Sequence, residues 1–169
     1  MTVTRRHVVS DGWREAVYSD CERYRYRLTV SWDERAPRLL YVMLNPSKAT
    51  ELVNDPTIER CERRARQLGY GAFGVANLFG LRETSPARLK SARAPEGPHN
   101  MRAIDDSVAW SDSVLAAWGV HGTHRAQGAK VLKRLRTCGA PLLHLGLTKE
   151  GHPRHPLYIP YKIKPEPWA

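Results

Sequence analysis

Four short polar segments hold the residues of this chain that could do chemistry. They are Asn45-Pro46-Ser47, Asn77-Leu78-Phe79, Gly119-Val120-His121 and the stretch Gly151–Leu157, which contains His152 and His155. An Asn amide presents a donor beside an acceptor, so Asn77 could pair with adjacent carbonyl and imino groups of a pyrimidine. A histidine of the last segment could donate a hydrogen bond to an oxygen on which negative charge develops.

Asn45 is a polar residue that directly follows an apolar run. Its amide can orient water but cannot usefully accept a proton, so Asn45 would not act as a general base. Asp55, a short distance downstream, could supply a carboxylate, although a helix cap explains it equally well. The other groups have structural alternatives too: Asn45-Pro46 and Asn77 are typical of turns, and a loop histidine can simply lie at the surface.

The elements expected early in the chain would position the first segment. Residues 24–32 alternate large, mostly apolar side chains with polar ones, which predicts a half-buried strand at the edge of a hairpin. Residues 39–44 are continuously apolar, as in a strand covered on both faces, and they end where the first segment begins. A helix is predicted to start with Asp55 as N-cap and Pro56 at its first position, and to end at Gly69.

Strands and helices alternate in the rest of the chain. The predicted strands cover residues 73–79, 113–118 and 142–147, and the predicted helices follow Ser85-Pro86 and cover residues 100–110 and 123–136. We therefore expect an α/β fold: a single three-layer α/β/α domain over residues 1–169, with a mostly parallel central sheet. Ligands bind beyond the carboxyl ends of such strands, so the four polar segments would gather on one rim.

The composition favours a soluble protein that attracts a polyanion. Lys and Arg number 27 against 17 Asp and Glu, which gives a net charge of +10 and a pI near 9.9. Nucleic acid is the natural partner for such a surface, although basic side chains can also serve solubility alone. We expect a cytoplasmic protein, because the sequence has no membrane-spanning run, no secretory signal and only three widely spaced cysteines.

The order of the four polar segments resembles that of the signature segments of the uracil-DNA glycosylase superfamily. The whole chain resembles the domain family DUF1643, and the likeness to the superfamily covers residues 39–158. The resemblance implies a uracil-DNA glycosylase-like domain in which Asn45 positions the attacking water. Asn77, together with Ser47 and Phe79, would then bind the flipped base. Either His152 or His155 would stabilise the departing base, with His152 as first choice because it begins the motif.

Two departures from the superfamily pattern bear on the substrate. Strict uracil enzymes carry a Tyr that excludes 5-substituted pyrimidines, whereas this chain has the small Ser47 at that place. This difference implies a pocket that is open to a 5-modified pyrimidine. The base-stacking aromatic residue of the superfamily has no counterpart, since residues 48–55 contain no aromatic side chain.

Basic residues on two predicted helices and in the last segment are candidates for binding DNA phosphates. Such contacts fix the orientation of a protein on DNA without recognising its sequence. Leu157 could enter the base stack, as apolar side chains of minor-groove proteins do. Solvated helix faces and a core leucine are the structural alternatives. The candidate phosphate-binding residues are Arg60, Arg63, Arg64, Lys133 and Arg154.

The first functional hypothesis is a DNA N-glycosylase that hydrolyses the glycosidic bond of a flipped pyrimidine, in DNA repair or in defence against phage DNA. This chemistry requires no metal and no other cofactor, and we infer neither a membrane nor an obligate protein partner. The second hypothesis is a non-catalytic domain of the same fold that binds nucleic acid or a nucleotide. A metal-dependent phosphate-ester hydrolase is a third, although the His-rich segment lacks the usual spacing of metal ligands.

Overall fold

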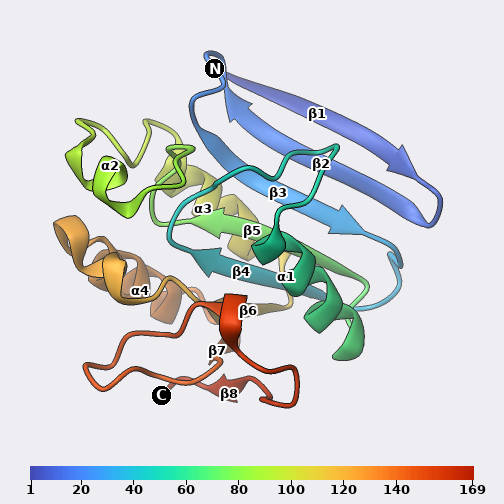
Figure 1. The fold of residues 1–169 in the computed structure, drawn as a ribbon. Coiled ribbons are helices and arrows are strands. Elements are labelled where there is room, and N and C mark those ends of the chain that lie inside the picture. The colour runs from blue at the N-terminus through green and yellow to red at the C-terminus, as the bar shows by residue number, and fades with distance from the viewer.

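An eight-stranded sheet runs through the molecule in the computed structural model, which describes residues 1–169 (Figure 1). The order of the strands in the sheet is β1-β2-β3-β5-β4-β6-β7-β8. The strands are β1 (Thr2–Val9), β2 (Gly12–Ser19), β3 (Arg25–Ser31), β4 (Arg38–Met43), β5 (Ala72–Asn77), β6 (Ser113–Ala116), β7 (Leu142–His144) and β8 (Glu166–Pro167).

The sheet is mixed, and most of its strand pairs are antiparallel. Strands β5, β4, β6 and β7 run parallel to one another in the middle of the sheet. The β1-β2-β3 meander, the β3-β5 pair and the β7-β8 pair are antiparallel, so four of the seven pairings are antiparallel. The prediction of a three-layer α/β/α domain with a mostly parallel sheet is therefore wrong, because the first 31 residues add three antiparallel strands to the parallel group.

The strand predicted at residues 24–32 does not lie at the edge of the sheet. It is β3, which pairs with β2 on one side and with β5 on the other. Strand β2 contributes Ala16 and Tyr18 to the core and thereby extends the sheet beyond β3. The edge is instead β1, whose side chains are mostly exposed on both faces.

Four α-helices pack against the sheet: α1 (Pro56–Gln67), α2 (Pro86–Ser91), α3 (Asn100–Trp110) and α4 (Gln127–Thr137). The predicted start of α1 is confirmed, since Asp55 Oδ1 accepts a hydrogen bond from Ile58 N at 2.9 Å and Pro56 is the first helical residue. Gly69 follows the helix with a φ of +86°, a conformation that glycine adopts without strain. Two 3₁₀ turns complete the structure, η1 (Val120–Ala126) and η2 (Pro156–Tyr158).

The helices divide between the two faces of the sheet, with α1 in front of it and α3 behind it in Figure 1. Helix α1 buries Ile58, Cys61 and Ala65 against one face. The opposite face packs against apolar residues of the other three helices, namely Leu89, Ile104, Val108, Val131 and Leu135. No helix has the length and apolar character needed to cross a bilayer.

Candidate functional site

A cavity of about 430 Å³ lies where the parallel strands β4, β5 and β6 end. This volume is within the range of about 300 to 1,000 Å³ that small-molecule sites occupy. The chain segments after these strands form part of its wall, together with β3, the start of α1, the loop before α2 and the segment after β7. Among the lining residues are Arg25, Asn45, Ser47, Asp55, Asn77, Trp118, His121, His155 and Leu157.

Asn77, the last residue of β5, is a buried wall residue whose polar atoms are unused. Phe73 and Val75 of the same strand pack on the α1 side of the sheet, so alternation directs Asn77 to that side as well. Its side chain is 1% exposed, and neither Nδ2 nor Oδ1 has a hydrogen-bond partner. Because a buried polar group without a partner costs about 1 to 3 kcal/mol, this amide is suited to pair with a ligand that enters the cavity.

The backbone that carries Asn77 is held by two other buried amides. Asn100 Nδ2 donates to the carbonyl oxygens of Asn77 at 2.8 Å and Leu78 at 3.0 Å. Gln127 Nε2 donates to the Leu78 carbonyl at 3.2 Å. Leu78 N in turn donates to Met43 O of the neighbouring strand. The carbonyl groups of Asn77 and Leu78 are thus bonded, while the Asn77 side chain that faces the cavity is not.

Arg25, the first residue of β3, is a second buried wall residue and was not among the predicted site residues. It is 1% exposed, donates from Nη1 to Ala49 O at 2.8 Å, and has no partner for Nε. No carboxylate lies within ion-pair distance of it. Burial lowers the pKa of Arg25 to about 10, with the charge of Asp55 opposing the shift, so the guanidinium stays charged at neutral pH.

A bulge explains why the alternation of β3 did not predict Arg25 as an inward residue. Val17 of β2 pairs with Arg27, but the next residue, Tyr18, pairs with Arg25, so Tyr26 is the extra residue. This shift turns Arg25 to the α1 side, where its guanidinium meets the loop after β4.

Asn45 and Asp55 both line the cavity and both hold its loops together. Asn45 donates from Nδ2 to the carbonyl oxygens of Pro46, Leu81 and Glu83, at 2.7 to 3.2 Å, and its Oδ1 takes no part in these bonds. Asp55 uses one carboxylate oxygen to cap α1 and the other to accept from Ala49 N at 3.1 Å. Both oxygens of Asp55 are therefore committed to the backbone.

The structure separates the two histidines of the last segment. His155 lines the cavity, whereas His152 lines a different cavity beside Trp118 and Trp168. His155 Nδ1 accepts a hydrogen bond from Leu157 N at 3.3 Å, which leaves Nε2 to carry the ring proton. Burial lowers the pKa of His155, against the charge of Asp55, and keeps the ring neutral. His155 is thus a neutral hydrogen-bond donor in the wall.

The remaining predicted base-binding residues differ in their positions. Ser47 and Leu157 line the cavity with Asn77. Phe79 does not line it; the ring is fully buried and packs against His124, with 5.6 Å between the ring centroids. His121 of the third polar segment was assigned no role, but it lies in the cavity wall, and burial lowers its pKa.

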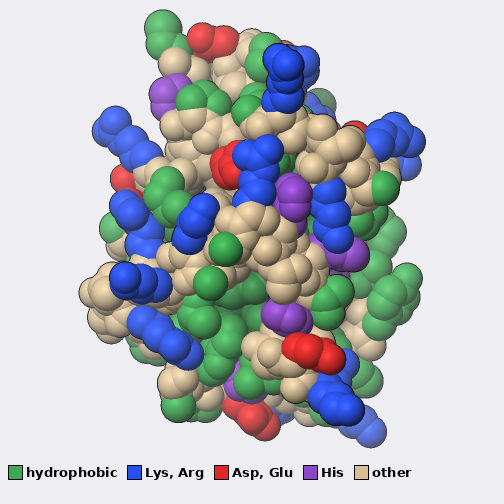
Figure 2. Space-filling model, turned by 90° about the vertical axis from the view of Figure 1, so that its left-hand side faces the viewer, with side chains coloured by type: hydrophobic (Ala, Val, Ile, Leu, Met, Phe, Trp, Pro, Cys, Tyr) green, Lys and Arg blue, Asp and Glu red, His purple; other side chains and the backbone are tan.

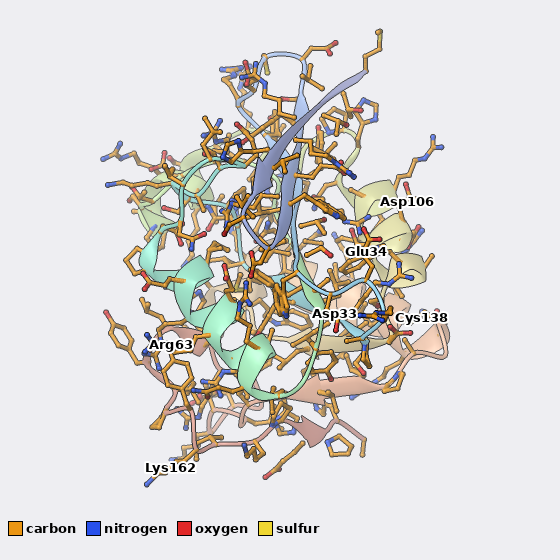
Figure 3. All side chains as sticks on the ribbon, turned by 90° about the vertical axis from the view of Figure 1, so that its right-hand side faces the viewer. Asp33, Glu34, Arg63, Asp106, Cys138 and Lys162 are labelled. Carbon is orange, nitrogen blue, oxygen red and sulfur yellow. The ribbon has the colours of Figure 1, made fainter.

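Two of the predicted phosphate-binding arginines hold the C-terminal part of the chain. Arg60 donates to Ile159 O at 2.7 Å, and Arg64 donates to Ile159 O at 2.8 Å and to Ile163 O at 3.0 Å. These bonds fix the segment that carries His155 and Leu157. Arg63, in contrast, is exposed on α1 (Figure 3), and Lys133 and Arg154 are exposed as well.

We expect Arg64→Ala to lower the free energy of unfolding by about 2 to 3 kcal/mol, because two charge-assisted hydrogen bonds from a buried guanidinium are lost. The matched variant Arg63→Ala, one residue away on the same helix, should change it by no more than about 0.5 kcal/mol. Urea unfolding of both variants measures the difference. Equal losses in the two variants would contradict the anchoring role of Arg64.

In this α/β protein, the carboxyl ends of the parallel strands meet at a cavity whose wall contains buried polar side chains. The family model described as "Protein of unknown function (DUF1643)" matches residues 25–157, and the chain therefore belongs to this family. The match runs from Arg25 to Leu157, so it includes every cavity residue named above. No curated protein and no solved structure matches the chain. The resemblance to uracil-DNA glycosylases stays a prediction.

Proposed function

We propose that this protein is a DNA N-glycosylase-like enzyme that binds a flipped pyrimidine in the cavity and hydrolyses its glycosidic bond. The observation that carries the proposal is the buried, unpartnered amide of Asn77 in the cavity wall. Enzymes that act on a base take it out of the helical stack and recognise its Watson–Crick edge in a tight pocket. The donor and acceptor of one Asn side chain match the imino and carbonyl groups of such an edge.

Asn45 and His155 have positions and chemistry that support the hydrolysis. Water attacks C1′ and gives up a proton to the solvent, the bond from C1′ to the base nitrogen breaks, and the base leaves with the electron pair and takes up a proton from the solvent. Asn45 would orient the water through its Oδ1, because its Nδ2 already donates to backbone carbonyls. His155 would donate from Nε2 to a base oxygen and stabilise the negative charge of the leaving group.

The small side chain of Ser47 in the cavity wall supports a 5-modified pyrimidine as substrate. A large side chain at this position would fill space that a substituent could otherwise occupy. Excision of unmodified uracil in clear preference to 5-substituted pyrimidines would argue against this part of the proposal.

Basic side chains on the cavity face are suited to hold the DNA backbone. Figure 2 shows the end of the molecule where β4 and β5 finish, with many Lys and Arg side chains, few acidic ones and several histidines. Arg154 is exposed and directly precedes the cavity residue His155. It is the clearest candidate for a phosphate contact beside the site.

We expect Arg154→Ala to weaken binding of all DNA sequences alike and to reduce the slope of log affinity against log salt by about 1. The matched control is Arg35→Ala, since Arg35 is exposed and precedes β4, at the end of the strand opposite the cavity. Fluorescence anisotropy with one labelled duplex at several salt concentrations measures both slopes. An equal effect of the two substitutions would show that the cavity face is not the DNA-binding surface.

The proposed activity is tested with oligonucleotides that carry a panel of bases, incubated with the protein and then treated with alkali to cleave abasic sites. Each reaction is run with and without a chelator. Abasic sites that form in the presence of the chelator support the proposal. Direct strand scission that the chelator abolishes would indicate a metal-dependent phosphate-ester hydrolase instead.

A non-catalytic base-binding domain is the second candidate, and the bonding of Asn45 and Asp55 favours it. Asn45 cannot accept a proton, and both oxygens of Asp55 are bonded to backbone N–H groups. Tight binding of an oligonucleotide with a particular base, without abasic product, would identify this function.

A further inference from the structure

The strand order arranges the polar groups of the cavity in a row. Arg25 comes from β3, Asn77 from the adjacent β5 and Asn45 from the end of β4, while His155 belongs to the segment that follows β7. Neighbouring strands are about 4.8 Å apart. Arg25 and His155 therefore lie on opposite sides of Asn77 in the cavity wall.

The donors of Arg25 are not used up by the protein. Arg14, a buried arginine of β2, donates to the carbonyl oxygens of Thr50 and Glu51 and lies 3.8 Å from a carboxylate oxygen of Glu62. Arg25 makes one hydrogen bond, to Ala49 O, and its buried Nε has no partner. A buried cation without a carboxylate is costly, which is an indication that a ligand supplies the missing acceptor.

A pyrimidine in this cavity has one position that Arg25 can reach beside Asn77. If Asn77 pairs with N3 and the group at C4, and His155 binds the oxygen at C2, the remaining side of the ring next to C4 is C5. The order Arg25, Asn77, His155 along the wall matches the order C5, C4–N3, C2 around the ring. Ser47, also in the wall, adds little bulk to the cavity.

We propose that Arg25 recognises an oxygen-bearing substituent at C5 of the pyrimidine, such as a hydroxymethyl, formyl or carboxyl group. This inference rests on the proposed base-binding function and names the substrate class. Hydrogen bonds from a guanidinium to an oxygen are strong, and bonds to a carboxylate are the strongest. The negative charge of Asp55 acts on Arg25 and partly balances its positive charge, so a neutral acceptor oxygen is enough for Arg25. Asp55 also accepts hydrogen bonds from two backbone N–H groups, which reduces its repulsion of an anionic substituent.

The test compares thymine, whose 5-methyl group has no acceptor, with 5-hydroxymethyl-, 5-formyl- and 5-carboxyluracil in otherwise identical oligonucleotides. The wild-type protein should excise the oxygen-bearing bases about 10- to 100-fold faster than thymine, as expected for one charged hydrogen bond. Arg25→Met should lower the ratio of these excision rates to the thymine rate by about 10-fold or more. Arg82→Met is the matched control, since Arg82 lies near Tyr18 but does not line the cavity.

Binding to 2′-fluoro versions of the same oligonucleotides, which resist glycosidic cleavage, separates this inference from the proposed catalysis. A binding preference for the oxygen-bearing bases that Arg25→Met removes, with no excision from the corresponding oligonucleotides that lack the 2′-fluoro group, would support Arg25 recognition and overturn the glycosylase. Excision with no preference for these bases over thymine would overturn the role of Arg25 and leave the glycosylase intact. If Arg25→Met does not fold, the wild-type binding comparison decides the matter, because binding to the 2′-fluoro oligonucleotides does not depend on how readily the base leaves.

Discussion

Replacing Asn77 with Ala should lower the rate of base excision by about 100- to 1,000-fold, the usual effect of removing a hydrogen-bonding group that acts on the reacting ligand. Nonspecific DNA binding should stay nearly unchanged, because it depends on phosphate contacts at the surface. Single-turnover excision and salt-dependent binding, measured on the same preparation, test both statements. A variant that keeps wild-type excision would remove the main support for a base-binding cavity.

The stability of this variant distinguishes a ligand-binding amide from a structural one. Asn77 and Asn100 are each 1% exposed, but Asn100 donates two hydrogen bonds to the backbone whereas Asn77 makes none. Asn100→Ala should therefore lower the free energy of unfolding by about 1 to 3 kcal/mol. Asn77→Ala should leave it unchanged or raise it, although the side chain is equally buried. Denaturant unfolding of the pair measures this contrast.

Local sequence signals were sufficient for the elements with strong helical or apolar patterns. The caps of α1 followed from Asp55, Pro56 and Gly69, and α3 has the predicted bounds of Asn100 and Trp110. Each of these signals depends on a few neighbouring residues, so the helix ends are determined locally and tertiary packing does not shift them. Helix α4 was predicted too long, because Arg125 and Ala126 adopt a positive φ that interrupts the helix before Gln127.

The architecture of the sheet could not be predicted in the same way, because the balance of parallel and antiparallel strand pairs depends on strands with weak sequence patterns. Strand β1 carries Arg5, Arg6 and His7 and is exposed on both faces, so it lacks the alternation that marks a half-buried strand. Its pairing with β2 makes a long hairpin that turns the sheet from mostly parallel to mostly antiparallel. The number of strands at an edge is a property of long-range pairing and not of local sequence.

The candidate site was predictable where it depends on strand ends and not where it depends on details of register. Asn45 and Asn77 follow apolar runs, and the end of such a run is visible in the sequence. Arg25 faces inward because of a bulge at Tyr26, and no local pattern marks that bulge. The same holds for His152 and His155, since only the course of the loop decides which ring lines the cavity.

The second large effect is expected at His155. His155→Leu should lower the excision rate by about 100- to 1,000-fold, because the cavity loses a placed donor to the leaving base. His152→Leu should have little effect on the same rate, since His152 lines a separate cavity. Rates measured for both variants on one substrate at pH 7.5 compare the two rings directly, and a larger loss for the His152 variant would reverse the assignment.

The pH dependence of His155 has a definite sign. Burial lowers its pKa below the ordinary value of about 6.5, and the charge of Asp55 only partly opposes this. The ring therefore stays neutral as pH falls through 6.5 and gains a proton only at lower pH. That proton would occupy Nδ1, which now accepts from Leu157 N, and two N–H groups would face each other. Excision should thus be level from pH 8 to about 6.5 and decline below that range.

The free energy of unfolding should also depend on the protonation of His155. As pH falls below about 6.5, the unfolded chain binds a proton at His155 that the folded chain does not, so the free energy of unfolding decreases until the folded pKa is passed. This contribution of His155 to the free energy of unfolding is fully present above the pKa that the histidine has in the unfolded chain. It should be absent in His155→Leu. Unfolding of wild type and variant between pH 5 and 8 isolates it, with His152→Leu as control. A stability advantage of wild type over His155→Leu that grows as pH falls would mean that His155 is held as the charged imidazolium, and the neutral donor in the proposed mechanism would then be lost.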